Sequence, residues 1–88
     1  MNNAIVIGRI KEIEENKLVL TVARPFKNKK EKYKEDFITC KLSNEMCETL
    51  LKYCEKNNLI AIKGELHSDN ENMYVSVNKL TFSASKNG

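Results

Sequence analysis

Tryptophan is absent from the 88 residues, histidine and proline occur once each, and no hydrophobic run approaches the roughly 18 residues that a membrane span requires. The N-terminus has a short apolar run with no basic segment before it, which argues against a signal peptide. With one histidine, no paired carboxylates in an apolar setting and no glycine-rich phosphate loop, the chain shows no nucleophile–base set. We therefore expect a cytoplasmic protein that is not an enzyme, needs no cofactor and does not enter a membrane.

The three cysteines, Cys40, Cys47 and Cys54, are odd in number and form no Cys-x-x-Cys pair. This favours reduced thiols in a cytosol over a disulfide framework. Their spacing places Cys40 on the core face of a strand and the other two on the buried side of a helix, whereas structural zinc sites use closer ligand pairs. We expect them to be small apolar core residues, with no bound metal and with His67 at the surface.

Positive charge is concentrated in one segment, residues 24–34. The segment carries six basic side chains and one acidic one, although the whole chain has a net charge of only +3. Phe26 and Tyr33 lie within it. Cations neutralise phosphates, and aromatic rings stack on unpaired bases. This combination predicts a loop that binds single-stranded nucleic acid; the alternative is a solvated surface loop.

The periodicity of apolar residues predicts five strands and one helix. We expect strands at residues 3–10, 17–23, 36–42, 59–66 and 73–82, with polar connections at 11–16 and 67–72. Ser43 is the expected N-cap of a helix of about twelve residues. Its predicted buried stripe consists of Met46, Cys47, Leu50, Leu51 and Cys54.

The predicted order is β-β-β-α-β-β, which is the order of the OB-fold. We therefore expect an all-β domain with one helix, a five-stranded Greek-key barrel over residues 1–83, followed by a short polar tail at 84–88. The binding surface of such a barrel lies on its second and third strands and the neighbouring loops. The basic segment joins these two strands, so charge and fold order indicate the same surface.

Several segments resemble bacterial single-stranded DNA-binding proteins. Residues 1–10 (MNNAIVIGRI) resemble the family's opening strand, 23–28 (ARPFKN) the end of its second, 36–40 (DFITC) its third and 59–66 (LIAIKGEL) its fourth. The resemblance implies a non-catalytic protein that binds single-stranded DNA in replication, recombination or repair, associated with the nucleoid. It also implies a homodimer or homotetramer that pairs through its first strand, and replication or repair proteins as partners.

The chain departs from the family pattern at several points. It lacks tryptophan, and Ser43 stands where the family often has another aromatic residue. The connections after the first and fourth strands are shorter, and the chain ends Ser85-Lys86-Asn87-Gly88 where the family has a tail with an acidic, apolar tip. These differences favour a short accessory relative or a primosomal-type OB protein.

The expected nucleic-acid surface combines the basic loop with the outward face of the third strand. Phe37 faces outward by parity, because Ile38 and Cys40 supply the core face. The resemblance implies that Phe37 stacks on a base and that Arg24 and Phe26 contribute beside the loop. For Tyr74, packing in the core or in an interface is an equal alternative. The full predicted set is Arg24, Phe26, Lys27, Lys29, Lys30, Lys32, Tyr33, Lys34, Phe37, Thr39, Lys41 and Tyr74.

The first strand predicts self-assembly, because an exposed edge rich in Ile and Val invites pairing with a second copy. The expected interface is Asn3, Ala4, Ile5, Val6 and Ile7. Two other functions remain open. One is an OB-fold adaptor of a replication or primosome complex with weak nucleic-acid contact, favoured by the missing tryptophan and by Ser43. The other is RNA binding, which uses the same chemistry.

Overall fold

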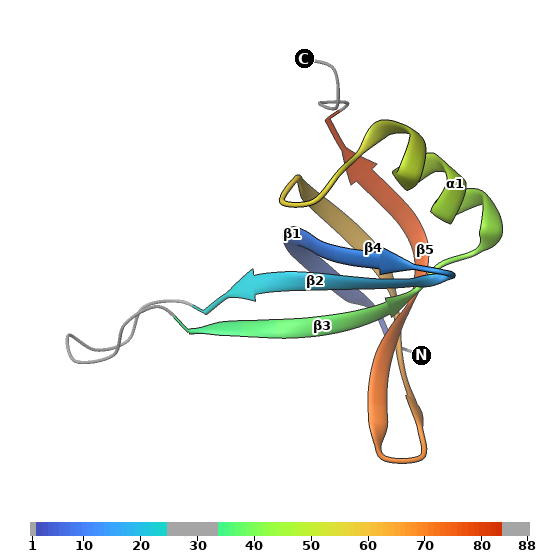
Figure 1. Ribbon diagram of the computed structural model, residues 1–88. Coiled ribbons are helices and arrows are strands. Elements are labelled where there is room, and N and C mark those ends of the chain that lie inside the picture. Colours follow the sequence, from blue (N-terminus) through green and yellow to red (C-terminus); the bar gives the residue numbers. More distant parts are fainter. Residues whose placement is uncertain (1, 25–33, 84–88) are drawn as a thin grey trace.

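Five strands close into a barrel in the computed structural model, which describes residues 2–24 and 34–83 (Figure 1). The elements are β1 (Ala4–Glu14), β2 (Lys17–Ala23), β3 (Glu35–Lys41), α1 (Asn44–Tyr53), β4 (Leu59–Asp69) and β5 (Asn72–Phe82). Around the barrel the strands run β1-β2-β3-β5-β4, and β4 pairs with β1 to close it. Among the pairings of the described strands, only the short β3–β5 pairing is parallel. The predicted element order and the OB-fold are confirmed.

Two of the strands are longer than predicted. β1 continues to Glu14 and β4 to Asp69, into polar segments that were expected to be connections. Antiparallel partners satisfy the backbone groups of these residues, as in the pairs Glu14↔Lys17 and Asp69↔Asn72. The connections therefore shrink to two residues each, and each begins with a residue at positive φ, Glu15 at 55° and Asn70 at 60°. The prediction stopped these strands too early because their ends are mostly polar and exposed, although Ile13 of β1 is half-buried and packs against the core.

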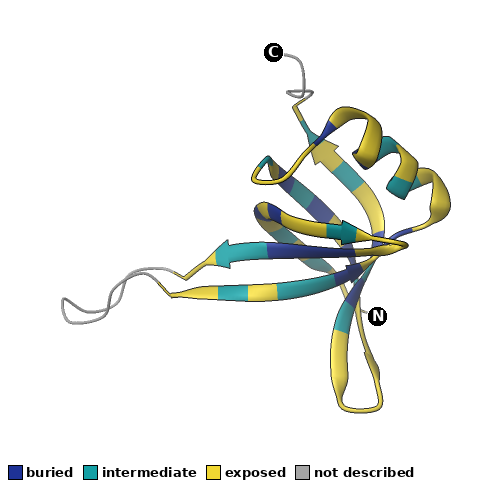
Figure 2. Cartoon of the chain, viewed as in Figure 1, coloured by how far each residue is buried: buried dark blue, intermediate teal, exposed yellow. Residues whose placement is uncertain are grey.

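The barrel interior holds the core. Its fully buried side chains come from all five strands and from α1: Ile10, Leu18, Leu20, Cys40, Leu50, Ile60, Ile62 and Val75. Figure 2 shows the buried positions gathered where the strands converge, while the two projecting hairpins are mainly exposed or half-buried. Residues 66–74 form one of these projections, which we call the arm. The arm lies beyond the barrel because β5 pairs with β3 only from Val75 onward.

The helix α1 lies at the end of the barrel opposite the arm (Figure 1). Ser43 is its N-cap, as predicted, and its Oγ accepts a hydrogen bond of 3.2 Å from the backbone N–H of Met46. The helix ends at Tyr53, about half a turn earlier than predicted. Leu50 and Cys54 are buried, but Leu51 is 53% exposed. The prediction for Leu51 is wrong because the helix contacts the barrel along a stripe narrower than an amphipathic pattern suggests.

All three cysteines are free. Cys40 and Cys54 are buried, whereas Cys47 is half-buried and its thiol donates a hydrogen bond of 2.8 Å to the carbonyl of Glu15. Burial raises the pKa of the Cys40 thiol to about 12. Cys40 and Cys54 are core residues as expected, and Cys47 packs against the core while only half-buried.

These environments predict selective thiol modification. At pH 8 a disulfide reagent should modify Cys47 in the native protein, and Cys40 and Cys54 only after unfolding, since a buried thiol is not accessible to the reagent. Because the folded state holds the Cys40 proton more tightly, the free energy of unfolding should fall as pH rises from about 9 towards 12. Mass spectrometry of the modified peptides tests the selective modification, with Cys47→Ser as the control. Native modification of Cys40 as fast as Cys47 would contradict the burial.

In the described part of the chain, no helix combines the length and the apolar character needed to cross a membrane. Residues 2–24 and 34–83 likewise contain no group of three or more His, Cys, Asp and Glu side chains placed to hold a metal ion.

Candidate nucleic-acid interface

The outward-facing residues of β2 and β3 form one continuous surface, which we call the outer face. Side chains alternate along each strand, and Leu18, Leu20 and Cys40 point into the core. Their neighbours therefore point to the other side of the sheet, in three cross-strand pairs, although Val19 is itself only 8% exposed. These pairs are Thr21↔Phe37, Val19↔Thr39 and Lys17↔Lys41.

Phe37 is the most exposed aromatic ring on the outer face. Its side chain is 58% exposed, although burying a phenylalanine is worth about 1.5–3 kcal/mol. The ammonium of Lys11 lies 5.2 Å from the ring centroid. Lys11 reaches this position because β1 carries a bulge between Ile10 and Glu12, and a bulge re-aims the extra side chain. An exposed ring beside a cation is suited to stack on a base next to its phosphate.

Arg24 stands where β2 leads into the basic loop, but it is engaged with Asp36. Its Nε donates to both carboxylate oxygens of Asp36 at 3.0 Å, and its Nη2 donates to Oδ1 at 2.7 Å. The backbone N–H of Arg24 also donates to the carbonyl of Lys34 at 2.9 Å. These hydrogen bonds from Arg24 lower the pKa of Asp36. Arg24 therefore joins the two strand ends at the base of the loop.

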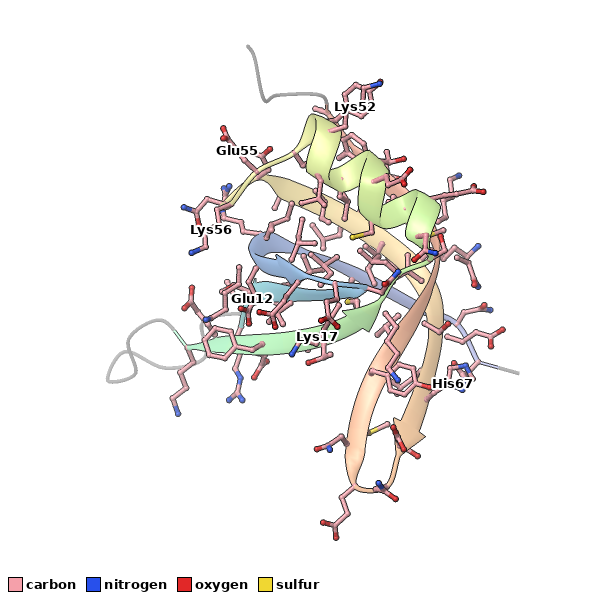
Figure 3. All side chains as sticks on the ribbon, turned by 45° about the vertical axis from the view of Figure 1, so that its right-hand side comes forward. Glu12, Lys17, Lys52, Glu55, Lys56 and His67 are labelled. Atoms are coloured by element: carbon pink, nitrogen blue, oxygen red, sulfur yellow. The ribbon has the colours of Figure 1, made fainter. Side chains whose placement is uncertain are left out.

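The other end of the outer face meets the arm. The ammonium of Lys41 lies 4.0 Å from the centroid of the Tyr74 ring, a cation–π contact. The ring of His67 lies 5.8 Å from that of Tyr74, and its Nε2 is 3.3 Å from Oε1 of Glu65. Figure 3 shows Lys17 on the barrel and His67 on the arm. Tyr74 is thus half-buried between side chains of the two parts.

The predicted binding residues divide into two groups. Arg24, Lys34, Phe37, Thr39, Lys41 and Tyr74 are described, and Phe37, Thr39 and Lys41 share the outer face, with Tyr74 beside it. The remaining six, Phe26, Lys27, Lys29, Lys30, Lys32 and Tyr33, lie outside the described residues.

Sequence reasoning missed two lysines of this surface. Lys17 lies on the outer face because side chains alternate along β2 and its neighbour Leu18 points inward. The alternation in the sequence could therefore have predicted the position of Lys17. Lys11 had no such signal, because its direction depends on the bulge in β1.

The predicted assembly residues separate by parity along β1. Ala4 and Val6 pack against the core, whereas Ile5 and Ile7 are 71% and 59% exposed. β1 pairs with β4 along Ala4–Arg9 and with β2 from Arg9 onward. Among the described strands, none pairs with the second edge of residues 4–8. An open edge and two exposed isoleucines therefore occur on the same short segment.

Comparison with known proteins identifies a family and related sequences. Residues 1–83 match the model of the family described as single-strand binding protein family. Single-stranded DNA-binding protein 1 of Lactococcus lactis subsp. lactis is 31% identical, over 80% of this chain and 53% of that protein. The protein of the same name from Streptococcus pyogenes is 32% identical, over 80% of this chain and 62% of that protein. The chain therefore spans about half to three fifths of the length of these relatives.

Solved structures share the fold. The mitochondrial single-stranded DNA-binding protein of S. cerevisiae superposes with a TM-score of 0.69 at 13% identity, covering 99% of this chain and 98% of that one. The Plasmodium falciparum SSB in complex with single-stranded DNA gives a TM-score of 0.68 at 19% identity, covering 94% of this chain and 95% of that one. A small single-stranded DNA-binding protein from Streptomyces coelicolor gives 0.63 at 9% identity, covering 94% of each chain. At these identities the likeness concerns the fold.

Proposed function

This chain belongs to the single-strand binding protein family, and we propose that it binds single-stranded DNA, without catalysis, through the outer face. The observation that carries the proposal is Phe37, a largely exposed ring on the outer face with the ammonium of Lys11 over it. An apolar ring of this size is costly to leave in water, and a nucleobase covers it without selecting a sequence.

The chemistry of the surface favours single strands over duplex. Phe37 offers a ring to an unpaired base, while Lys11, Lys17 and Lys41 offer ammonium groups to the phosphates on either side. Stacked bases in a duplex have no free face for the ring, so only the electrostatic part of the contact would remain. The lysine-rich loop would add further cations. Binding of this kind fits roles in replication, recombination or repair, with their proteins as further partners.

Binding is expected to depend steeply on salt. Released counterions make the logarithm of the binding constant fall linearly with the logarithm of salt, by roughly 0.7 per phosphate contacted on a single strand. Fluorescence anisotropy with labelled oligo-dT at several salt concentrations measures this slope. Lys17→Ala and Lys41→Ala should each reduce the slope, whereas Lys52→Ala on α1 should not. No binding at low salt, or an equal affinity for duplex, would refute the proposal.

We further propose that two copies pair through the open edge of β1. An unpaired strand edge carries unsatisfied N–H and C=O groups, and antiparallel self-pairing satisfies them. A two-fold axis there would also bring the isoleucine side chains at positions 5 and 7 of both copies together. Both features belong to the same segment, residues 4–8.

Sedimentation tests the assembly. At micromolar concentration the protein should sediment as a dimer or a larger oligomer. The double change Ile5→Lys and Ile7→Lys should shift it towards the monomer, because like charges would then lie opposite one another. Leu51→Lys, on a comparably exposed leucine of α1, is the control and should leave the assembly intact. A wild-type protein that stays monomeric would contradict the proposal.

A further inference from the structure

A cleft of about 290 Å³ lies between the outer face and the arm. Its barrel wall consists of Lys17, Thr39 and Lys41, and its arm wall of Asp69, Asn72, Met73 and Tyr74. The volume is close to the lower limit of about 300 Å³ for small-molecule sites, which suits a single nucleotide better than a longer stretch of strand.

The barrel wall of the cleft is suited to a phosphate. Lys17 and Lys41 are direct cross-strand partners on β2 and β3, and like charges in that position repel. A phosphate bound between the two ammonium groups would remove this repulsion and gain charge-assisted hydrogen bonds. The contact of Lys41 with the Tyr74 ring holds its ammonium at the cleft.

The arm wall has the opposite character. Asp69 and Asn72 are the last cross-strand pair before the turn, and both line the cleft. The carboxylate of Asp69 repels phosphates and only accepts hydrogen bonds, while the amide of Asn72 both donates and accepts. This wall therefore suits a base better than the backbone of the strand.

We infer that the cleft holds one nucleotide, with its phosphate between Lys17 and Lys41 and its base edge against Asp69 and Asn72. The inference rests on the proposed function. Cytosine and adenine carry an exocyclic amino group that donates to a carboxylate, whereas thymine presents a carbonyl there. The cleft consequently introduces a base preference into a surface that is otherwise neutral to sequence, in favour of cytosine over thymine.

The ratio of affinities for oligo-dC and oligo-dT measures the preference, because both are pyrimidine strands and differ at the base edge. Anisotropy competition at fixed salt should show that Asp69→Ala reduces the dC-to-dT affinity ratio about fivefold, the low end of the discrimination expected from one base contact. Part of that change should be a higher affinity for oligo-dT, because the substitution removes a charge that repels the thymine carbonyl.

Glu71→Ala is the matched control, because it removes the same charge from the turn of the arm without changing the lining of the cleft. It should raise the affinity for both oligonucleotides slightly and leave their ratio unchanged. Equal ratios in wild type, Asp69→Ala and Glu71→Ala, with binding intact, would overturn the inference alone. Failure of the wild type to bind either oligonucleotide would overturn the proposed function, and the inference with it.

Discussion

Replacement of Phe37 by Ala is expected to weaken the binding of oligo-dT by about 5- to 150-fold, which corresponds to the 1–3 kcal/mol of one base–aromatic stack. The ring is exposed on the outer face, so its removal leaves no cavity in the core and should change the free energy of unfolding little. The loss should persist at high salt, because stacking is not screened as phosphate contacts are. Anisotropy titration at two salt concentrations separates the two contributions.

Two variants make the Phe37 experiment specific. Phe37→Trp should retain binding, since a larger ring still offers a stacking face. Tyr53→Ala removes another exposed aromatic ring, on α1, and should leave the affinity unchanged. If Phe37→Ala binds oligo-dT as tightly as the wild type, stacking on the outer face is refuted. Retained capture of replication proteins without DNA would then favour the adaptor function.

Gly64→Ala is expected to lower the free energy of unfolding by about 3 kcal/mol or more, a large part of the roughly 5–15 kcal/mol available to a small domain. A Cβ atom at Gly64 would lie 2.0 Å from the carbonyl oxygen of Ser76 and 3.0 Å from the Cα of Val77. These are backbone atoms of β5, so relief requires the two longest-paired strands to move apart. The position coincides with a shift of register between β4 and β5, at Lys63 and Gly64.

Urea denaturation of Gly64→Ala, Lys63→Ala and the wild type measures this effect. Lys63 is the neighbouring residue on β4 and is exposed, so its change to alanine should alter the free energy of unfolding by less than about 0.5 kcal/mol. Gly8→Ala should also destabilise, because its Cβ would lie 2.6 Å from the carbonyl oxygen of Thr21. If the free energies of unfolding of Gly64→Ala and Lys63→Ala are equal, the backbone of β5 can move away from position 64 at little cost.

Alternation of side chains along a strand was enough to predict part of the candidate site. The outward direction of Phe37, Thr39 and Lys41 followed from alternation along one strand, and the structure agrees. The phosphate contact of Arg24 stays a prediction, and the structure adds that its guanidinium pairs with Asp36, twelve residues away. The contact between Arg24 and Asp36 depends on which residues of β2 and β3 lie opposite each other. The sequence of the basic segment between the two strands does not predict this register.

Local patterns by themselves determined the order of the elements, the bounds of β2, the N-cap at Ser43 and the face of Phe37. Each depends on residues close in sequence, through side-chain alternation or one capping hydrogen bond. Only the tertiary structure decided the exposure of Leu51, the position of Lys11 over Phe37 and the meeting of Lys41 with Tyr74. These depend on how the helix lies on the barrel, where β1 bulges and how β5 crosses β3. Such features arise from contacts between distant segments, which no local pattern encodes.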